Sequence, residues 1–421
     1  MARIGRTFLS VVAGFALSVG IFAGPGVPTA QAQMRLGAGM GPMGDSDQVT
    51  SADIERFSKT LELTKTQKSA LDELFKGYEA DFEVARKAMQ DTMEKVRAEF
   101  QDTGDPSVWQ KDLPEAREKF VQRSTELEKS LISDLKAMLT PDQTKKWPYA
   151  ERAQRRAKGL SGMNAPGITL AGDSVDLIRL VDEQKLKTRS ETMVQLLDRY
   201  ESEVDQAIIE RDAKRKDVQE HFTNGAKKDA AGGGGGMPDF SKIGEMMGEM
   251  RKSGIKVRDV NDRYSTLIAA AMPEDTRESF TMAYKKAKFP QIYKEAYSLK
   301  ALNAAKDFKD LTSDQRSGID EILSKYKREI SAANERYARA QADAEKDGGG
   351  NDMMGGWMKM MGGGGGDQGN DDSELSQARK ARRKLDTDAL DQLKALLTPE
   401  QKEQLPERQN DWMQWGGGGK R

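Results

Sequence analysis

The sequence contains no cysteine and only one histidine, His221, in 421 residues. Disulfides, thiolate chemistry and cysteine-rich metal sites are therefore excluded. A lone imidazole without cysteine partners is a poor zinc site, and a nucleophilic triad that needs histidine has at most this one candidate. The 68 acidic residues are so numerous that no carboxylate pair stands out. We therefore expect a protein that is not an enzyme.

Long apolar runs are also scarce, and the one that is present lies near the N-terminus. Arg3 and Arg6 precede the apolar residues 8–23, and an Ala-Gln-Ala site follows at residues 30–32. The run is shorter than the roughly 20 residues that a membrane helix needs, so it is typical of a secretory signal rather than an anchor. We expect a signal peptide, a periplasmic mature protein and no membrane span after cleavage.

The net charge does not favour nucleic-acid binding, and the low aromatic content does not favour one large core. The formal net charge is −1, and 32% of the residues are charged while only 6% are aromatic. This composition suits long exposed helices with narrow apolar seams. Basic clusters occur at Arg152–Lys158 and Arg379–Lys384, but acidic residues are interspersed, so we interpret both clusters as solvated helix faces.

A five-residue pattern, Leu-Thr-x-x-Gln, occurs four times. Each copy is typical of a capping box, in which Thr accepts a hydrogen bond from the backbone N–H three residues later and Gln reaches back to the backbone of Thr. Proline follows Thr in two copies, as suits the first helical position. The pattern predicts a helix start at each copy, formed by Leu63, Thr64, Gln67, Leu139, Thr140, Gln143, Leu311, Thr312, Gln315, Leu397, Thr398 and Gln401.

This motif, present twice in a helical unit behind a signal peptide, resembles the Spy and CpxP family of bacterial periplasmic proteins. Members of that family are small four-helix chaperones or stress regulators, with the two motif copies at corresponding helix starts, and they pair as dimers. The resemblance implies an all-α fold and the binding of unfolded or partly folded exported proteins without ATP or a cofactor. It also raises a dimer as one option for this chain, whose oligomeric state stays open.

Longer internal similarities indicate three tandem units. Tyr78, Tyr200 and Tyr326 end related segments that are 122 and 126 residues apart, a spacing closer to small domains than to solenoid repeats. In the middle unit the second motif, at residues 271–275, has lost Thr and Gln. The predicted divisions are a signal peptide (1–32), a disordered linker (33–50), unit 1 (51–158), a linker (159–172), a degenerate unit 2 (173–290), unit 3 (291–412) and a Gly-rich tail (413–421).

Each unit is expected to contain a short helix, a long helix, a linker and two more helices. Apolar residues of the long helices advance by alternating steps of four and three, the period of a coiled-coil seam. Helices near 115–138, 240–271 and 373–396 are the expected partners. The seams are most simply packing surfaces, but their tyrosine and alanine content buries little area. Candidates for client contact on them are Phe75, Tyr78, Phe82, Leu197, Tyr200, Leu323, Tyr326 and Ile330.

The linkers inside the units are expected at 101–114, about 223–239 and about 346–372, and the last two are Gly-rich and so predicted to be disordered. No Gly-Lys-Ser/Thr follows them, so they are not phosphate loops. Besides tolerated insertions, methionines there could form adaptable client contacts or thioether ligands for Cu(I). The candidates for Cu(I) are Met353, Met354, Met358, Met360 and Met361.

These observations favour an all-α periplasmic protein of three Spy-like units, acting as a holdase or envelope-stress protein on partly unfolded clients. Two alternatives remain open. One is a methionine-based metal-responsive or metal-sequestering envelope protein, and the other is a structural coiled-coil spacer.

Overall fold

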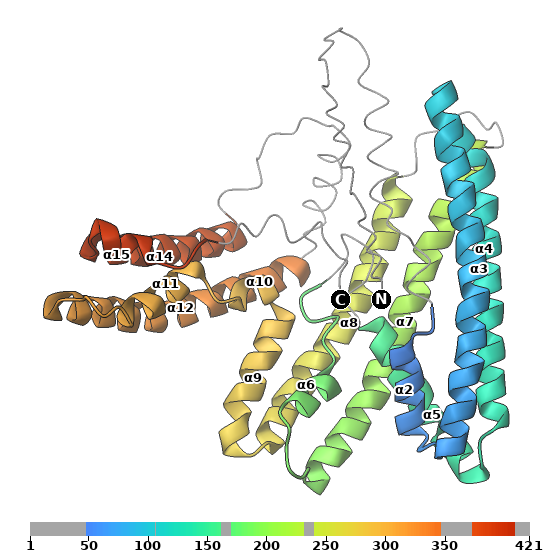
Figure 1. Ribbon diagram of the computed structural model, residues 1–421, viewed down its shortest axis with the longest axis horizontal. Coiled ribbons are helices and arrows are strands. Elements are labelled where there is room, and N and C mark those ends of the chain that lie inside the picture. Colours follow the sequence, from blue (N-terminus) through green and yellow to red (C-terminus); the bar gives the residue numbers. More distant parts are fainter. Residues whose placement is uncertain (1–47, 106, 161–169, 231–239, 347–372, 409–421) are drawn as a thin grey trace, which may run out of the picture. The chain divides into compact units, whose positions relative to one another are not determined.

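The computed structural model describes residues 48–105, 107–160, 170–230, 240–346 and 373–408. Within these ranges the regular structure is all helix, joined by short turns, and contains no strand (Figure 1). The all-α prediction is therefore confirmed. Among the described helices, none combines the length and apolar character that a bilayer crossing requires. The predicted signal peptide, the Gly/Met-rich loop at 347–372 and the tail lie outside the described residues.

The helices follow one order three times: short, long, long, short. The first group contains α2 (Ser51–Thr60), α3 (Lys65–Thr103), α4 (Val108–Ala137) and α5 (Pro141–Gly159). The second contains α6 (Leu177–Glu183), α7 (Glu191–Ala230), α8 (Phe240–Ala271) and α9 (Glu274–Lys288), and the one-turn α10 (Pro290–Tyr293) follows it. The third contains α11 (Tyr297–Lys306), α12 (Ser313–Lys346), α14 (Glu374–Leu396) and α15 (Pro399–Glu403).

In each group the two long helices pack side by side as a hairpin, α3 with α4, α7 with α8 and α12 with α14 (Figure 1). The seams predicted from the sequence therefore find the partners that were expected. Each hairpin has its own apolar core. Leu71 and Leu135 are fully buried in the first core, Ile208 and Ile268 in the second, and Leu393 in the third. Burial of these side chains supplies most of the stability of each hairpin.

The first linker is much shorter than predicted. We expected it at 101–114, but α3 continues to Thr103 and α4 already begins at Val108. Gly104 ends α3 with a left-handed backbone (φ 67°), and its N–H donates to the carbonyl of Phe100 at 2.9 Å. Pro114 lies inside α4. Its fixed φ is compatible with a helix, and the turn loses one hydrogen bond because proline has no N–H.

Two other predicted boundaries are wrong. The disordered linker was expected to reach residue 50, yet Val49 is fully buried and its N–H donates to the hydroxyl of Tyr78 at 2.9 Å. Thr50 also caps α2 through a capping box with Asp53, in which aspartate replaces the usual Glu or Gln. Residues 223–230, which were expected in a loop, belong to α7, which continues to Ala230 and contains His221 well before its end.

The three repeated tyrosines lie at equivalent places in the hairpins. Each hydroxyl bonds to the segment at or just before the short helix of its own group: Tyr78 accepts from Val49 N–H, Tyr200 from Leu177 N–H (3.3 Å), and Tyr326 from the Ser298 hydroxyl (3.1 Å). Burial raises the pKa of Tyr200 and also that of Tyr326, so these hydroxyls stay protonated. The tyrosines anchor the short helices to the hairpins.

Candidate functional site

All four copies of the motif begin a helix with the hydrogen bonds of a capping box. In every copy the Thr N–H donates to Gln Oε1 at 3.0 Å. The Gln N–H donates to Thr Oγ1 at 3.2–3.3 Å. These bonds satisfy backbone groups that the first turn would otherwise leave unpaired. They use only the oxygen of each carboxamide, so both amino protons of Gln remain available to other acceptors.

In the first group those amino groups connect the two copies of the motif. Gln67 Nε2 donates to Gln143 Oε1 at 2.8 Å, and Gln143 Nε2 donates to Gln67 Oε1 at 2.9 Å. The remaining protons go to backbone carbonyls, from Gln67 to Met138 (2.8 Å) and from Gln143 to Glu62 (3.2 Å). We call this reciprocal pair the first amide clasp. It ties the start of α3 to the start of α5.

The third group contains a second amide clasp. Gln315 Nε2 donates to Gln401 Oε1 at 3.0 Å, and the reverse contact is longer, at 3.5 Å. Again each amide also reaches a backbone carbonyl, that of Leu396 at 2.8 Å and that of Asp310 at 3.2 Å. Gln401 is only 2% exposed, so its polar atoms depend on these partners.

The middle group has no clasp. Met193 stands at the position of the first glutamine and Met272 at that of the second threonine, and both belong to the buried core of the group. Ser190 keeps the capping role, since its hydroxyl accepts from Met193 N–H at 3.2 Å. Pro273 precedes α9 without a side-chain cap. Apolar packing therefore replaces the polar link between the two helix starts.

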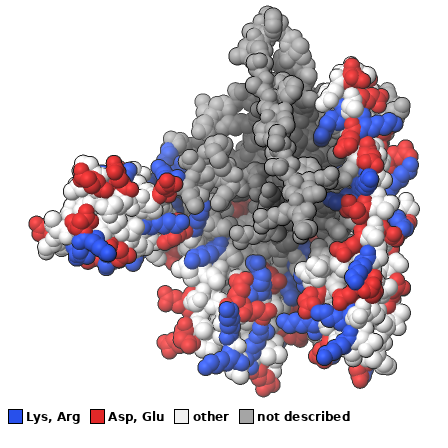
Figure 2. Space-filling model, viewed as in Figure 1, with Lys and Arg blue, Asp and Glu red and all other residues white. Residues whose placement is uncertain are grey.

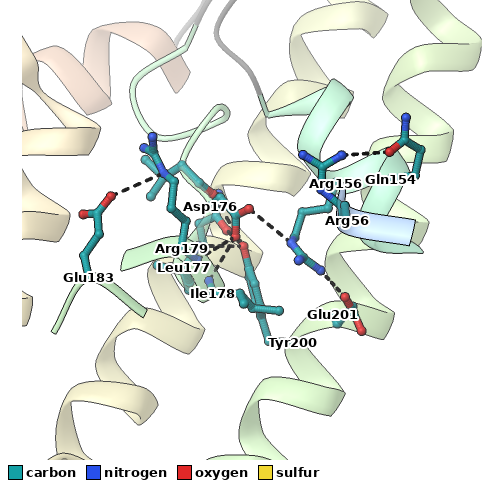
Figure 3. A network of polar contacts seen from close by, with 12 residues as sticks. Arg56, Gln154, Arg156, Asp176, Leu177, Ile178, Arg179, Glu183, Tyr200 and Glu201 are labelled. Atoms are coloured by element: carbon teal, nitrogen blue, oxygen red, sulfur yellow. Dashed lines mark hydrogen bonds and ion pairs between the residues drawn. The ribbon is translucent and has the colours of Figure 1, made fainter. Parts of the chain in front are cut away.

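A network of buried and partly buried ion pairs connects α5 of the first group to α6 and α7 of the second (Figure 3). Arg155 forms two parallel hydrogen bonds with Asp205, at 2.8 and 2.9 Å. Arg156 pairs with Asp176 at 3.2 Å and also with Glu201. The interpretation of this basic cluster as a solvated face is therefore wrong, because Arg156 is only 8% exposed. Its charge is used between helices and is not available to acidic clients.

Asp176 has two roles in this network. It is the N-cap of α6 and accepts from the backbone N–H groups of Ile178 (3.0 Å) and Arg179 (3.2 Å), while its other oxygen bonds to Arg156 (Figure 3). Burial by itself would lower the pKa of Arg156, but the carboxylates of Asp176 and Glu201 outweigh it and raise that pKa. The guanidinium therefore stays charged.

The second basic cluster is mixed. Arg382 lies between helices and donates to Asn334 Oδ1 (2.7 Å) and to the carbonyl of Ile292 (3.1 Å). Lys384, in contrast, is exposed and pairs with Asp388 on the same helix. Only part of this cluster is the solvated face that the sequence indicated.

The residues proposed for client contact lie inside the hairpins. Seven of them are at most 8% exposed and form the three cores, and Ile330 is half-buried against the third core. The physical reason is that the coiled-coil period aims them at the partner helix. In this structure they cannot contact a client, so this set is corrected: Phe75, Tyr78, Phe82, Leu197, Tyr200, Leu323, Tyr326 and Ile330 are core residues.

An apolar groove of about 430 Å³ opens between α3 and α4, beyond the first core. The core ends at Phe82 and Phe120, whose rings meet edge to face at 5.6 Å. Further along the hairpin, Phe100 and Trp109 form another edge-on pair at 6.1 Å. Between the two aromatic pairs, Ala85 and Ala116 are small side chains on the facing helices, and space stays open beside them up to Lys95. The groove is lined by Ala85, Ala88, Met89, Thr92, Lys95, Asp112, Glu115, Ala116, Lys119, Phe120 and Arg123.

The rim of this groove carries both signs of charge, with lysine and arginine beside aspartate and glutamate. The same mixture extends over the described helices, as Figure 2 shows for the face it draws. Sequence reasoning missed the groove, although the small side chains of Ala85 on α3 and Ala116 on α4, two facing helices, were a readable signal.

Within the described ranges, no cluster of three or more His, Cys, Asp or Glu side chains could hold a metal ion. The methionines suggested for Cu(I), residues 353–361, lie outside those ranges.

No family model, no curated protein and no solved structure matches this chain. A relationship to the Spy and CpxP family therefore depends on the motif, its repetition and the geometry described above.

Proposed function

We propose that this chain is an exported, ATP-independent binding protein of the Spy and CpxP kind that holds partly unfolded exported proteins in the bacterial periplasm. The observation that carries the proposal is the reciprocal bonding of two motif copies in each of two helical groups. A capping box alone accounts for a Thr and a Gln at one helix start. It does not account for two copies whose carboxamides meet.

The first clasp closes one end of the first group and leaves the other end open. Near the clasp, α2 and α5 complete the apolar core around the α3–α4 hairpin. Beyond Phe82 the groove begins, and its described lining comes from α3 and α4 alone. This arrangement supports a binding role, since a rigid end can position an open apolar surface that is incompletely packed.

We assign client contact to the groove in place of the buried seam residues. Its walls of Ala85, Ala88, Met89 and Ala116 fit an apolar side chain from an extended segment. The rim offers Lys and Arg next to Asp and Glu, so neighbouring client charges of either sign find a partner. Such contacts are shallow and of low specificity, as a protein that holds many clients requires.

An aggregation assay tests the function. The purified protein, in modest molar excess over a heat-aggregating client, is expected to lower light scattering. Scattering that is unchanged by the protein would exclude the holdase function.

Filling the groove tests the site separately. Ala88→Phe and Ala116→Phe each place a ring in the groove and are expected to weaken protection while the circular dichroism of the helices is retained. Ala98→Phe is the matched control, because Ala98 is exposed on the same helix and does not line the groove. If A88F protects a client as well as A98F does, the groove is not the site, although holdase activity itself would stand.

A further inference from the structure

The turn at residues 170–176, just before α6, is held by side chains from other helices. Asn261 of α8 donates through Nδ2 to the carbonyls of Gly172 (2.8 Å) and Val175 (3.0 Å). Gly172 has a left-handed backbone (φ 92°) and packs against the side chain of Lys288, so a side chain larger than hydrogen would be strained there. The backbone of the turn thus depends on its neighbours for hydrogen bonds.

Two further helices reach the same turn. Arg211 of α7 donates to the carbonyl of Asp173 (3.1 Å) and to that of Gly159 at the end of α5 (2.8 Å). Glu345, near the end of α12, accepts from Ala171 N–H (3.1 Å). The turn is therefore a junction at which helices of all three groups meet, and any change in its stability affects the contact with α12.

The Asp173 carboxylate is poorly accommodated in this junction, and one guanidinium nitrogen of the buried Arg258 also lacks a hydrogen-bond partner among the described residues. Asp173 is 1% exposed, and among the described residues neither of its carboxylate oxygens has a hydrogen-bond partner of ordinary geometry. Charged groups of both signs lie near it. Arg211 and Arg215 from α7 and Glu345 from α12 act on its carboxyl group, while Arg258 from α8 and Lys288 from α9 pack against the neighbouring Gly172.

The balance of these groups disfavours the ionised carboxylate. Desolvation is the largest cause and raises the pKa of Asp173, and Glu345 raises it further, while Arg211, Arg215 and the backbone of Leu170 offset only part of the effect. The guanidinium of Arg211 donates to the backbone carbonyls of Asp173 and Gly159 and to the carboxylate of Asp212, and not to the Asp173 carboxylate. A buried charge without hydrogen bonds is costly, and protonation removes that cost.

We propose that Asp173 makes this junction acid-responsive: protonation of its carboxyl group strengthens the packing of the 170–176 turn on α7, α8 and the end of α12. The sign follows from linkage. A carboxyl group whose pKa is raised on folding contributes stability that is fully present below its ordinary pKa of 3.8 and is lost as the pH rises through the folded-state value. The packing of the 170–176 turn on α7, α8 and the end of α12 is therefore more stable in acid than at neutral pH.

The test is Asp173→Asn in the full chain, which removes the charge and keeps the size. The melting temperature of D173N is expected to exceed that of the wild type at pH 7.5, and the difference is expected to vanish near pH 4. Asp176→Asn is the matched control, three residues along the same turn. Because the Asp176 carboxylate is paired with Arg156 and two N–H groups, D176N is expected to lower the melting temperature at pH 7.5.

Hydrogen exchange gives a second, local measurement. At pH 7.5, after correction for intrinsic rates, D173N is expected to protect residues 170–177 and the last turn of α12 more strongly than the wild type does. An unchanged or lower melting temperature of D173N at neutral pH, a difference that is the same at both pH values, or failure of D173N to fold at neutral pH would each overturn the proposal. Equal exchange in the two proteins would overturn it as well.

Discussion

The first and third helical groups differ from the middle group in how their helix starts are joined. In the outer groups, Gln67 bonds to Gln143 and Gln315 bonds to Gln401. In the middle group the corresponding region is apolar. That group instead contacts its neighbours through buried charges, of which Arg156 with Asp176 is the clearest pair. The comparison teaches that the same order of helices can be stabilised in two ways. The outer groups use a hydrogen-bonded pair of glutamines, and the middle group uses apolar packing among its own helices together with ion pairs to the neighbouring group.

The largest effect is expected where the middle group depends on its neighbour. Arg156→Ala leaves Asp176 and Glu201 buried without their cation, so unfolding free energy measured in urea should fall by about 3–5 kcal/mol. Lys145→Ala is the matched control, because its pair with Asp142 is largely exposed and contributes at most about 1 kcal/mol. Equal effects of the two substitutions would show that the buried network does not hold the groups together.

The next largest effect tests whether the middle group tolerates a polar link. Met193→Gln places a carboxamide in an apolar core that lacks the second glutamine, and the expected loss is about 1–3 kcal/mol. Met193→Leu, which keeps the site apolar, is expected to cost less than about 1.5 kcal/mol. A stable M193Q protein would mean that a partner for the carboxamide exists in the middle group.

A test with an effect of similar size replaces first one glutamine and then both glutamines of the first amide clasp. Gln143→Met leaves the amide of Gln67 without its partner, and we expect a loss of about 2 kcal/mol. The double variant Q67M/Q143M imitates the middle group and should cost less than the sum of the two single changes. Strict additivity in this double-mutant cycle would show that the two carboxamides do not interact.

The smallest effect is expected at a single cap. Thr64→Ala removes the side-chain acceptor at the start of α3 and should cost about 1 kcal/mol. Thr66→Ala, two residues later on the exposed face of the same turn, is the control and should change stability little. If both substitutions have the same effect, the capping box is not a source of stability here.

Much of the fold could be predicted from local patterns. The motif placed four helix starts correctly at Thr64, Thr140, Thr312 and Thr398, because a capping box is made by residues within one turn. The spacing of apolar residues predicted the long helices, and the apolar face of each long helix indicated that it packs against a partner helix. Two boundaries were predicted wrongly because the local sequence fits a helix or core as well as a linker. Pro114 lies inside a helix, and Val49 belongs to the first apolar core.

The candidate site could be predicted only in part. The sequence identified both glutamines of each clasp but not that they bond to each other, since they are 76 or 86 residues apart. The residues expected to contact clients are core residues, because a seam that finds a partner helix is no longer exposed.

Local chemistry along the chain was therefore sufficient for the helix starts and for the helical period, because these depend on neighbours within a turn or two. The hairpin partners followed from the apolar face that each long helix has to bury. Only the folded arrangement decided that Arg156 is a buried ion-pair partner, that Asp173 is a buried carboxylate with no hydrogen bond of ordinary geometry to the described residues, and that a groove opens between α3 and α4. These properties depend on which distant helices pack together, and burial and dielectric surroundings arise from that packing alone.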